Sequence, residues 1–379
     1  MKKLIALMLV LVMLVALFAG CAPTTPDPTP PPTPAATPPA TVTDPEPPSL
    51  GMIEGWDLTN MPEGGFRVGL SNFSIGNSFR VQNMLTFEEE AQRLMELGII
   101  SEFLVTNSDG DTARQIADMR DFITMGFDIV LLTAISPTAL IPVVEEAVDA
   151  GVIVISFDSG VQTEAVTASI LLDNRAYGRI QAEWLVEQIG ESGRLIMLSG
   201  RAGTLTAEDR VLGSMDVLNQ FPDIEIIAHV YANFDYAEAR AAVEGLIAVH
   251  PDIDGIISHG GAMTRAAIDA FDAAGIPLVP MTGEPNNGLL RVWAERMDEG
   301  FSSIAPISPS WSSVLALHIG ITAATGGRFE KHSLIRLDPV TDDNLMDFVR
   351  FDLSDNFWAP SPLSEEVIQR LFGEGGEFS

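Results

Sequence analysis

The stretch DIVLLTAISPTALIPVVEEAVDAGVIVISFDSG, residues 128–160, indicates the fold class. Two runs of almost continuous Ile, Val and Leu, at 128–133 and 152–157, enclose a helical pattern at 137–150. Apolar runs of this kind suit strands that are buried on both faces, as in parallel sheets. A strand, a helix and a second strand in this order predict a right-handed crossover within a doubly wound α/β sheet.

The same alternation extends along most of the chain. We expect strands at 66–71, 101–106, 128–133, 152–157 and 167–172, and a second series at 194–199, 224–231, 254–258 and 277–282. The helical patterns between them lie at 79–97, 112–125, 137–150, 174–191, 207–220, 235–249, 262–274 and 286–298. Further strands are expected near 302–306 and 333–337. There the chain would cross from the second series of strands to the first and then return.

Two series of similar length favour two α/β lobes over one very large sheet. The first lobe is predicted at 66–172 plus about 306–336, and the second at 173–305 plus about 337–360. A three-segment hinge would join them, and 361–379 would form a C-terminal tail. Ligands bind outside the carboxyl ends of parallel strands, so two facing lobes would present their loops to one cleft.

Residues 1–20 have the pattern of an export signal. Lys2 and Lys3 precede an apolar run from Leu4 to Phe18 that is too short for a comfortable membrane span. Cys21 is the only cysteine, and the segment 17–21 that ends on it resembles a bacterial lipobox. That resemblance implies cleavage before Cys21, its lipidation, and anchoring to the bacterial cell membrane on the extracytoplasmic side. The alternative is an ordinary signal with an incidental cysteine.

The linker 21–50 follows the signal and is rich in Pro and Thr. Residues 22–50 hold 12 of the 25 prolines and seven threonines, with few apolar residues for a core. We expect a stiff, mostly polyproline spacer, which at ~3.1 Å per residue reaches up to roughly 90 Å.

Composition excludes several classes of function. The formal net charge is −31, whereas nucleic-acid binding needs clustered Lys and Arg. One cysteine and five scattered histidines argue against a metal centre. No dinucleotide fingerprint, P-loop or hydrolase motif is present. We therefore expect no cofactor, no metal, no nucleic acid and no covalent chemistry.

Charged, amide and aromatic side chains follow the predicted strands. Such groups suit a polyhydroxylated ligand, because polar groups bond its hydroxyls and rings cover its apolar face. The candidates are Asn77, Phe79, Arg80 and Asp158 in the first lobe, and Arg210, Phe234, Glu284, Asn286 and Asn287 in the second.

From about 66 to 360 the chain resembles the sugar-binding proteins of ABC importers, of the ribose and galactose type. The resemblance is carried by the segments 77–80, 157–158, 173–174, 200–204 with Arg210, 283–288 and 355–358. It implies two lobes joined by three crossings with a sugar held between them. By match of motif, it assigns ligand contacts to Asn77, Phe79, Arg80 and Asp158 in the first lobe and to Arg210, Phe234, Glu284 and Asn287 in the second.

One segment departs from the pattern of these relatives. They usually have Asn-Asp after the strand that corresponds to 254–258, whereas this chain has His259-Gly260-Gly261. A hydrogen-bonding amide is therefore missing. The ligand then differs from ribose or galactose, or Asn286 or Asn287 takes the place of that amide.

These features predict a monomeric lipoprotein that captures a monosaccharide and delivers it to an ABC permease with a separate ATPase. Binding would favour a closed state, because each lobe supplies part of the polar cage. A sensor subunit that signals sugar or autoinducer to a membrane receptor or kinase is an alternative, as is a nucleoside-binding lipoprotein. A secreted glycoside hydrolase is less favoured, although Asp158 and Glu284 could serve as acid and base.

Overall fold

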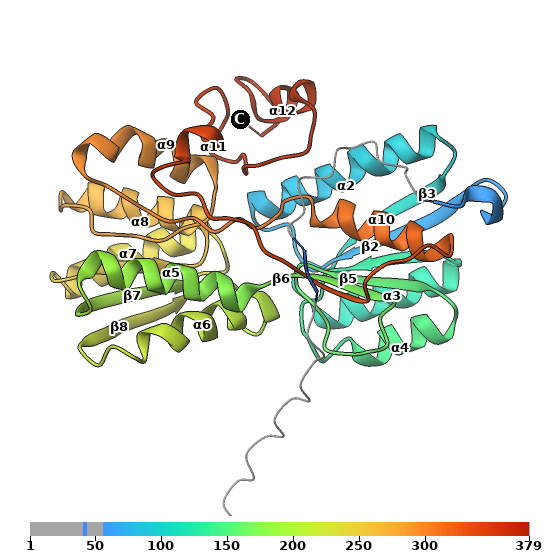
Figure 1. Ribbon diagram of the computed structural model, residues 1–379, viewed down its shortest axis with the longest axis horizontal. Coiled ribbons are helices and arrows are strands. Elements are labelled where there is room, and N and C mark those ends of the chain that lie inside the picture. Colours follow the sequence, from blue (N-terminus) through green and yellow to red (C-terminus); the bar gives the residue numbers. More distant parts are fainter. Residues whose placement is uncertain (1–40, 44–55, 379) are drawn as a thin grey trace, which may run out of the picture. The chain divides into compact units, whose positions relative to one another are not determined.

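The computed structural model describes residues 41–43 and 56–378. The predicted signal 1–20, Cys21 and most of the linker 21–50 lie outside the described residues. In the part of the chain that is described, no helix has both the length and the apolar character to cross a bilayer. Helices pack around two parallel sheets, which confirms the predicted α/β fold class (Figure 1).

The first sheet has seven parallel strands in the order β1-β10-β6-β5-β4-β2-β3. Their bounds are β1 Thr41–Thr43, β2 Phe66–Asn72, β3 Ile100–Asn107, β4 Ile129–Leu132, β5 Ile153–Phe157, β6 Ala168–Leu172 and β10 His332–Ile335. In β4 the side chains of Ile129 and Leu131 enter the core on one face, and those of Val130 and Leu132 enter the core on the other. Both faces are thus buried, which explains the apolar runs without alternation.

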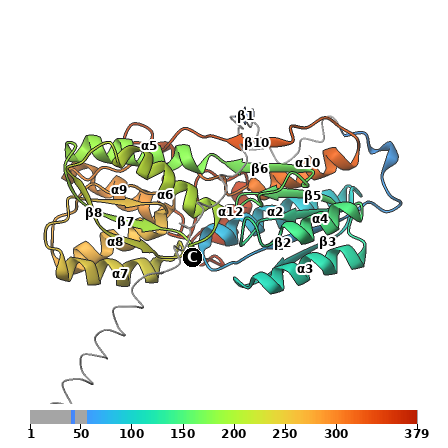
Figure 2. The same ribbon diagram turned by 90° about the horizontal axis from the view of Figure 1, so that it is seen from below.

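Two pairs of helices cover this sheet and complete the first lobe. Helices α2 (Ser78–Glu96) and α10 (Ser312–Ala324) pack on one face. Helices α3 (Thr112–Met125) and α4 (Ile141–Asp149) pack on the other, as Figures 1 and 2 show. The side chain of Asp111 caps α3, where it accepts hydrogen bonds from the N–H groups of Ala113 and Arg114.

The second lobe is built on a sheet of three parallel strands in the order β8-β7-β9. The strands are β7 Gly193–Ser199, β8 Ile224–Tyr231 and β9 Gly255–Ser258. Helices α5 (Asn174–Ile189) and α6 (Leu205–Leu218) share one core with Leu195 and Met197 of β7. The other face carries α7 (Tyr236–Val249), α8 (Gly261–Ala274) and α9 (Asn287–Arg296).

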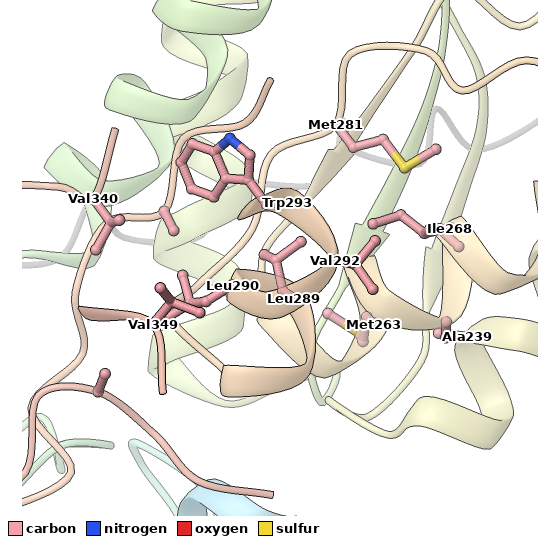
Figure 3. Packing of buried hydrophobic residues seen from close by; sticks show 14 of the residues in the cluster. Ala239, Met263, Ile268, Met281, Leu289, Leu290, Val292, Trp293, Val340 and Val349 are labelled. Atoms are coloured by element: carbon pink, nitrogen blue, oxygen red, sulfur yellow. The ribbon is translucent and has the colours of Figure 1, made fainter. Parts of the chain in front are cut away.

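The C-terminal segment 341–378 packs on the second lobe rather than extending away from it. It contains α11 (Leu345–Phe348) and α12 (Glu365–Phe372). Its apolar side chains, among them Leu353, Phe357, Ile368 and Phe372, belong to the same core as α8 and α9. Figure 3 shows Val340 and Val349 beside Leu290 and Trp293 of α9. The predicted tail 361–379 is therefore largely part of a core.

Several elements differ from the prediction. The stretch 277–282 is no strand, since only Met281 makes a bridge, to Ile256. The stretch 302–306 likewise makes only the bridge between Ala305 and Val340. Helix α10 was not predicted, because it is apolar on nearly all sides and has no helical alternation of polar residues. Strand β1 lies within the predicted linker and forms the edge of the first sheet, paired with β10.

Helices α5 and α6 approach so closely that glycine is required in each. A Cβ atom on Gly178 would lie 2.0 Å from the carbonyl oxygen of Arg210, and one on Gly213 would lie 2.1 Å from that of Arg175. The hydroxyl of Ser214 donates to the carbonyl of Gly178 at 3.2 Å. This contact fixes α6, and with it Arg210, against the start of α5.

We predict that Gly213→Ala lowers the free energy of unfolding by about 1–3 kcal/mol, because the added methyl group must push two helix backbones apart. The matched control is Gly245→Ala in α7, where a Cβ atom would meet nothing within 4 Å. That change should raise stability by about 0.5–1 kcal/mol. Denaturant unfolding of both variants checks the difference, and equal stabilities would contradict the packing described.

Candidate functional site

A cavity opens at the carboxyl ends of the strands of both lobes. It offers about 60 Å³ to the centres of water molecules, several times the ~10–15 Å³ that one water needs. First-lobe residues in its wall come from the β2–α2 connection and from the residue after β5. Second-lobe residues come from the loops after β7, β8 and β9 and from the segment 284–308. The complete lining is Phe73, Ser74, Gly76, Asn77, Phe79, Arg80, Asp158, Arg201, Thr206, Arg210, Asn233, Phe234, Gly260, Ala262, Glu284, Ser308 and Trp358.

Arg210 is the central cation of the second lobe and is only 3% exposed. Its Nε donates to Oδ1 of Asn174 at 2.9 Å, and its Nη1 donates to the carbonyl of His259 at 2.5 Å. Its Nη2 donates to Oε1 of Glu284 at 3.2 Å and to Oγ of Ser308 at 2.7 Å. The guanidinium carbon lies 3.8 Å from the ring centroid of Tyr177. All three guanidinium nitrogens are thus engaged, as burial of a cation requires.

Burial and ion pairing shift the pKa values of Glu284 and Arg210 in opposite directions. Desolvation raises the pKa of Glu284, while Arg210 and the hydroxyl of Ser308 favour its charged form. Burial by itself would lower the pKa of Arg210, yet Glu284 and its other neighbours raise it. Burial also raises the pKa of the Tyr177 hydroxyl well above its usual value. Arg210 is therefore a fixed cation at this wall of the cavity.

The first lobe presents a second arginine–carboxylate pair. Nη2 of Arg80 contacts Oδ2 of Asp158 in a salt bridge, and Nη1 donates to Oγ1 of Thr133 at 3.2 Å. The guanidinium carbon lies 4.4 Å from the ring centroid of Phe73. Asp158 has φ +55°, in the left-handed region that non-glycine residues rarely adopt. Such backbone strain is concentrated at functional sites.

In each carboxylate the described side chains converge on one oxygen. Arg210 and Ser308 both bond Oε1 of Glu284, and Arg80 and Thr133 both bond Oδ2 of Asp158. Within residues 56–378, Oε2 of Glu284 and Oδ1 of Asp158 accept from neither arginine and can accept hydroxyl protons.

Four aromatic rings line the same space: Phe73, Phe79, Phe234 and Trp358. Phe79 and Trp358 form an edge-to-face pair with centroids 5.3 Å apart. Phe234 has φ +59°. Its ring packs against Gly200, where an added Cβ atom would lie only 1.9 Å from Cζ of the ring. These rings supply apolar surface beside the two ion pairs.

The structure brings seven of the nine predicted contact residues to this cavity: Asn77, Phe79, Arg80, Asp158, Arg210, Phe234 and Glu284. Asn77 also caps α2, because its side chain accepts from the N–H of Arg80. Sequence reasoning missed Phe73, Arg201, Asn233, Ser308 and Trp358. Arg201 and Trp358 lie in the segments 200–204 and 355–358, which carry the resemblance, whereas Ser308 reaches the cavity only through long-range folding.

Asn286 and Asn287, the other two predicted contact residues, do not line the cavity. Nδ2 of Asn287 donates to the carbonyls of Arg350, Leu353 and Ser354, and its Oδ1 accepts from the N–H of Arg350. Nδ2 of Asn286 donates to the carbonyl of Asp355 at 2.8 Å. In this structure both amides hold the C-terminal segment 341–378.

The C-terminal segment connects the second lobe to α2 of the first. Gln82 is fully buried; its Nε2 donates to the carbonyl of Trp358 at 2.8 Å, and its Oε1 accepts from the N–H of Trp358 at 2.9 Å. The indole Nε1 of Trp358 donates to Oγ of Ser78 at 2.9 Å. Trp358 is therefore held in the cavity wall by contacts with both lobes.

His259 lies behind the cavity and is fully buried. Its ring contacts the hydroxyls of Ser199 and Ser214, at 3.2 and 3.0 Å, while its carbonyl accepts from Arg210. Burial, with the nearby charge of Arg210, lowers the pKa of His259 to about 3. A neutral imidazole thus supports the loop that carries Gly260 and Ala262 into the wall.

The chain is similar in sequence and in fold to known proteins. A family model described as a periplasmic binding protein domain matches residues 68–303. The ribose import binding protein of Bacillus subtilis (strain 168) is 24% identical over 266 residues, which are 70% of this chain and 84% of that protein. The D-ribose/D-allose-binding protein of Pseudomonas aeruginosa is 25% identical over 218 residues, 55% of this chain and 67% of that protein.

Solved structures share the fold. An ABC transporter solute binding protein from Thermobispora bispora is 26% identical, with a TM-score of 0.71 over 82% of this chain and 97% of that one. The binding protein of an arabinose ABC transporter from Shewanella sp. ANA-3, bound to arabinofuranose, is 19% identical. Its TM-score is 0.67 over 74% of this chain and 93% of that one.

We predict that Gln82→Ala lowers the free energy of unfolding by about 1–3 kcal/mol, since it leaves the buried N–H and carbonyl of Trp358 without partners. The control Arg370→Ala removes an exposed ion pair between Glu89 and the same C-terminal segment, which should cost about 1 kcal/mol or less. Denaturant unfolding measures both. A Gln82 variant no less stable than the control would contradict the role given to this contact.

Stability should also depend on pH through His259. The unfolded chain binds a proton near the ordinary pKa of 6.5, whereas the folded chain does so only near 3. This contribution is complete above pH 6.5 and is lost as the pH falls towards 3, by at most about 1.4 kcal/mol per pH unit. The raised pKa of Glu284 acts in the opposite direction.

Comparison of the chain with His259→Gln isolates the histidine. Between pH 6.5 and 4 the free energy of unfolding should fall less steeply in the variant. Parallel pH dependences in the two proteins would show that His259 titrates alike in the folded and unfolded states.

Proposed function

Because the chain belongs to the periplasmic binding protein domain family, we propose that it is an extracytoplasmic solute-binding lipoprotein that captures a monosaccharide between its two lobes for an ABC importer. One observation carries the proposal: each lobe presents a buried arginine–carboxylate pair to the same cavity. The names of its relatives refer to sugars, among them ribose, D-allose and D-apiose.

The two pairs suit a hydroxyl-rich ring. A sugar hydroxyl donates to a free carboxylate oxygen and accepts from a guanidinium N–H, so an ion pair holds adjacent hydroxyls. Oδ1 of Asp158 and Oε2 of Glu284 would accept two such protons from opposite sides. The rings of Phe79, Phe234 and Trp358 would cover the C–H surface of the sugar.

Closure of the cleft follows from the division of these groups between the lobes. A ligand that contacts only one lobe gains half of the polar interactions, so binding stabilises the state in which both lobes contact it. Two hydrogen bonds across the cleft accompany closure. Oγ1 of Thr206 donates to the carbonyl of Asp158 at 3.5 Å, and Nη2 of Arg201 donates to the carbonyl of Gly110 at 3.4 Å.

The amino-terminal sequence supports the anchoring and the partners that we propose. Cys21 in its lipobox-like segment would carry the lipid, and the proline-rich linker would hold the folded part clear of the membrane. The monomeric protein would then hand its sugar to a permease that a separate ATPase drives. No catalytic step is proposed, since both carboxylates in the cavity are already paired with arginine.

Calorimetric titration of the purified chain with pentoses and hexoses tests the proposal. At least one sugar should bind with a stoichiometry of one. Arg210→Gln and Asp158→Asn should each weaken that binding about 30-fold or more, because breaking a buried hydrogen-bonded charge pair costs about 2–5 kcal/mol.

The control is Arg175→Gln, which removes an exposed ion pair between α5 and Asp216 outside the cavity. It should leave affinity unchanged. Thermal unfolding of each variant shows that it is folded. The proposal fails if no sugar binds, or if the folded Asp158→Asn protein binds as tightly as the control.

A further inference from the structure

Arg201 is unlike the other two arginines in the cavity wall. Arg80 is paired with Asp158 and Arg210 with Glu284, but Arg201 has no carboxylate within 4.0 Å among the residues that the structure describes. All eighteen arginines of the chain lie in the described part, and sixteen of them form an ion pair. Arg201 and the exposed Arg328 form none with the residues that the structure describes. In so acidic a chain, an arginine without an acid at a ligand cavity needs an explanation.

The donors of Arg201 are mostly unused. Its Nη2 donates to the carbonyl of Gly110 at 3.4 Å, and this is its one side-chain hydrogen bond within residues 56–378. A guanidinium carries five N–H donors in a planar fork that matches the two oxygens of a carboxylate or phosphate. Arg210, by contrast, has every nitrogen engaged. The spare donors of the cavity wall thus include most of one guanidinium.

The start of α8 is a second, independent donor surface in the same wall. Its N-cap is Gly260, which provides no side-chain acceptor for the first-turn N–H groups, and Gly260 and Ala262 both line the cavity. Helices α2 and α6, which also begin at the cavity, are capped by the side chains of Asn77 and Thr204. Uncapped first-turn N–H groups carry partial positive charge and favour anions.

The charge of the wall points the same way. Three arginines and two carboxylates line the cavity, so its formal charge is positive although the whole chain carries −31. Both carboxylates already face an arginine. Each hydroxyl of a neutral sugar both donates and accepts, so such a ligand satisfies donors but leaves the surplus positive charge of the wall uncompensated. A ligand with an anionic group accepts from the same donors and also offsets that charge.

We propose that the ligand of this cleft is an acidic sugar, a monosaccharide that carries a carboxylate or phosphate, and that Arg201 binds the anionic group. This inference rests on the proposed function, because it names the class of sugar within the same cavity. Arg201 enters from the second lobe and lies against Gly110 of the first, where a Cβ atom would come within 2.5 Å of its Nη2. The anionic group would therefore lie where the lobes meet, and would draw them together.

Matched ligands test the inference. The purified chain is titrated with aldopentoses and aldohexoses, with the uronate and aldonate that correspond to each, and with their phosphate esters. At least one acidic sugar should bind tenfold or more tighter than its neutral counterpart. Comparison of the uronates and aldonates with the phosphate esters identifies whether a carboxylate or a phosphate is recognised. Raising the salt concentration should reduce the preference.

Two variants separate Arg201 from the general charge of the protein. Arg201→Gln should weaken the binding of the acidic sugar at least fivefold more than that of its neutral counterpart, which brings the preference to about twofold or less. Arg328→Gln removes the same charge from an exposed site outside the cavity, and should retain the full preference.

The other outcomes are distinct. Tighter binding of the neutral member of every pair overturns the acidic-sugar inference and leaves the proposed function intact. If Arg201→Gln loses the same factor of affinity for the acidic and the neutral sugar of a pair, Arg201 serves only as a contact between the lobes. That result also overturns the acidic-sugar inference. Binding of no sugar of either kind contradicts the proposed function itself.

Discussion

The arrangement of the second lobe around the cavity depends on the buried guanidinium of Arg210. A buried cation is tolerated only when its donors are all met and an opposite charge is near. Its partners come from the start of α5, the end of β9, the segment after Met281 and the passage back to the first lobe. Four separate parts of the chain must therefore converge on one side chain, and their convergence forms one wall of the cavity.

The glycines at the α5–α6 contact serve the same constraint. Gly178 and Gly213 let the two helix backbones touch, which places Arg210 of α6 over the ring of Tyr177 in α5. The first lobe repeats the scheme with Arg80, Asp158 and the ring of Phe73. Two similar arginine–carboxylate units thus face one cavity.

Much of the fold was predictable because parallel strands buried on both faces leave an unmistakable apolar run. Strand β8 and helix α3 have the predicted bounds, 224–231 and 112–125. Helix α10 was missed because a helix buried on nearly every side shows no periodicity. The stretch 277–282 looked like a strand by composition, but only Met281 pairs with β9.

The site was predictable where a motif follows a strand directly, as for Asp158 after β5 and Arg80 in the first turn of α2. It was not predictable where distant segments meet. Asn287 has the residue type of a sugar contact, yet its amide binds backbone some sixty residues away. No local sequence pattern shows that the C-terminal segment packs on α9 or that it brings Trp358 to the cavity. The contact between Trp358 and Gln82 of α2 is equally invisible in the sequence.

We propose that one ligand is held from both lobes at once by Asp158 and Arg210. A crystal structure of the protein with the ligand that it retains through purification would test this. We expect a hydroxyl-bearing ring in the cavity, with oxygens within hydrogen-bond distance of both the Asp158 carboxylate and the Arg210 guanidinium. A ligand bonded to one lobe only, or seated outside this cavity, would contradict it.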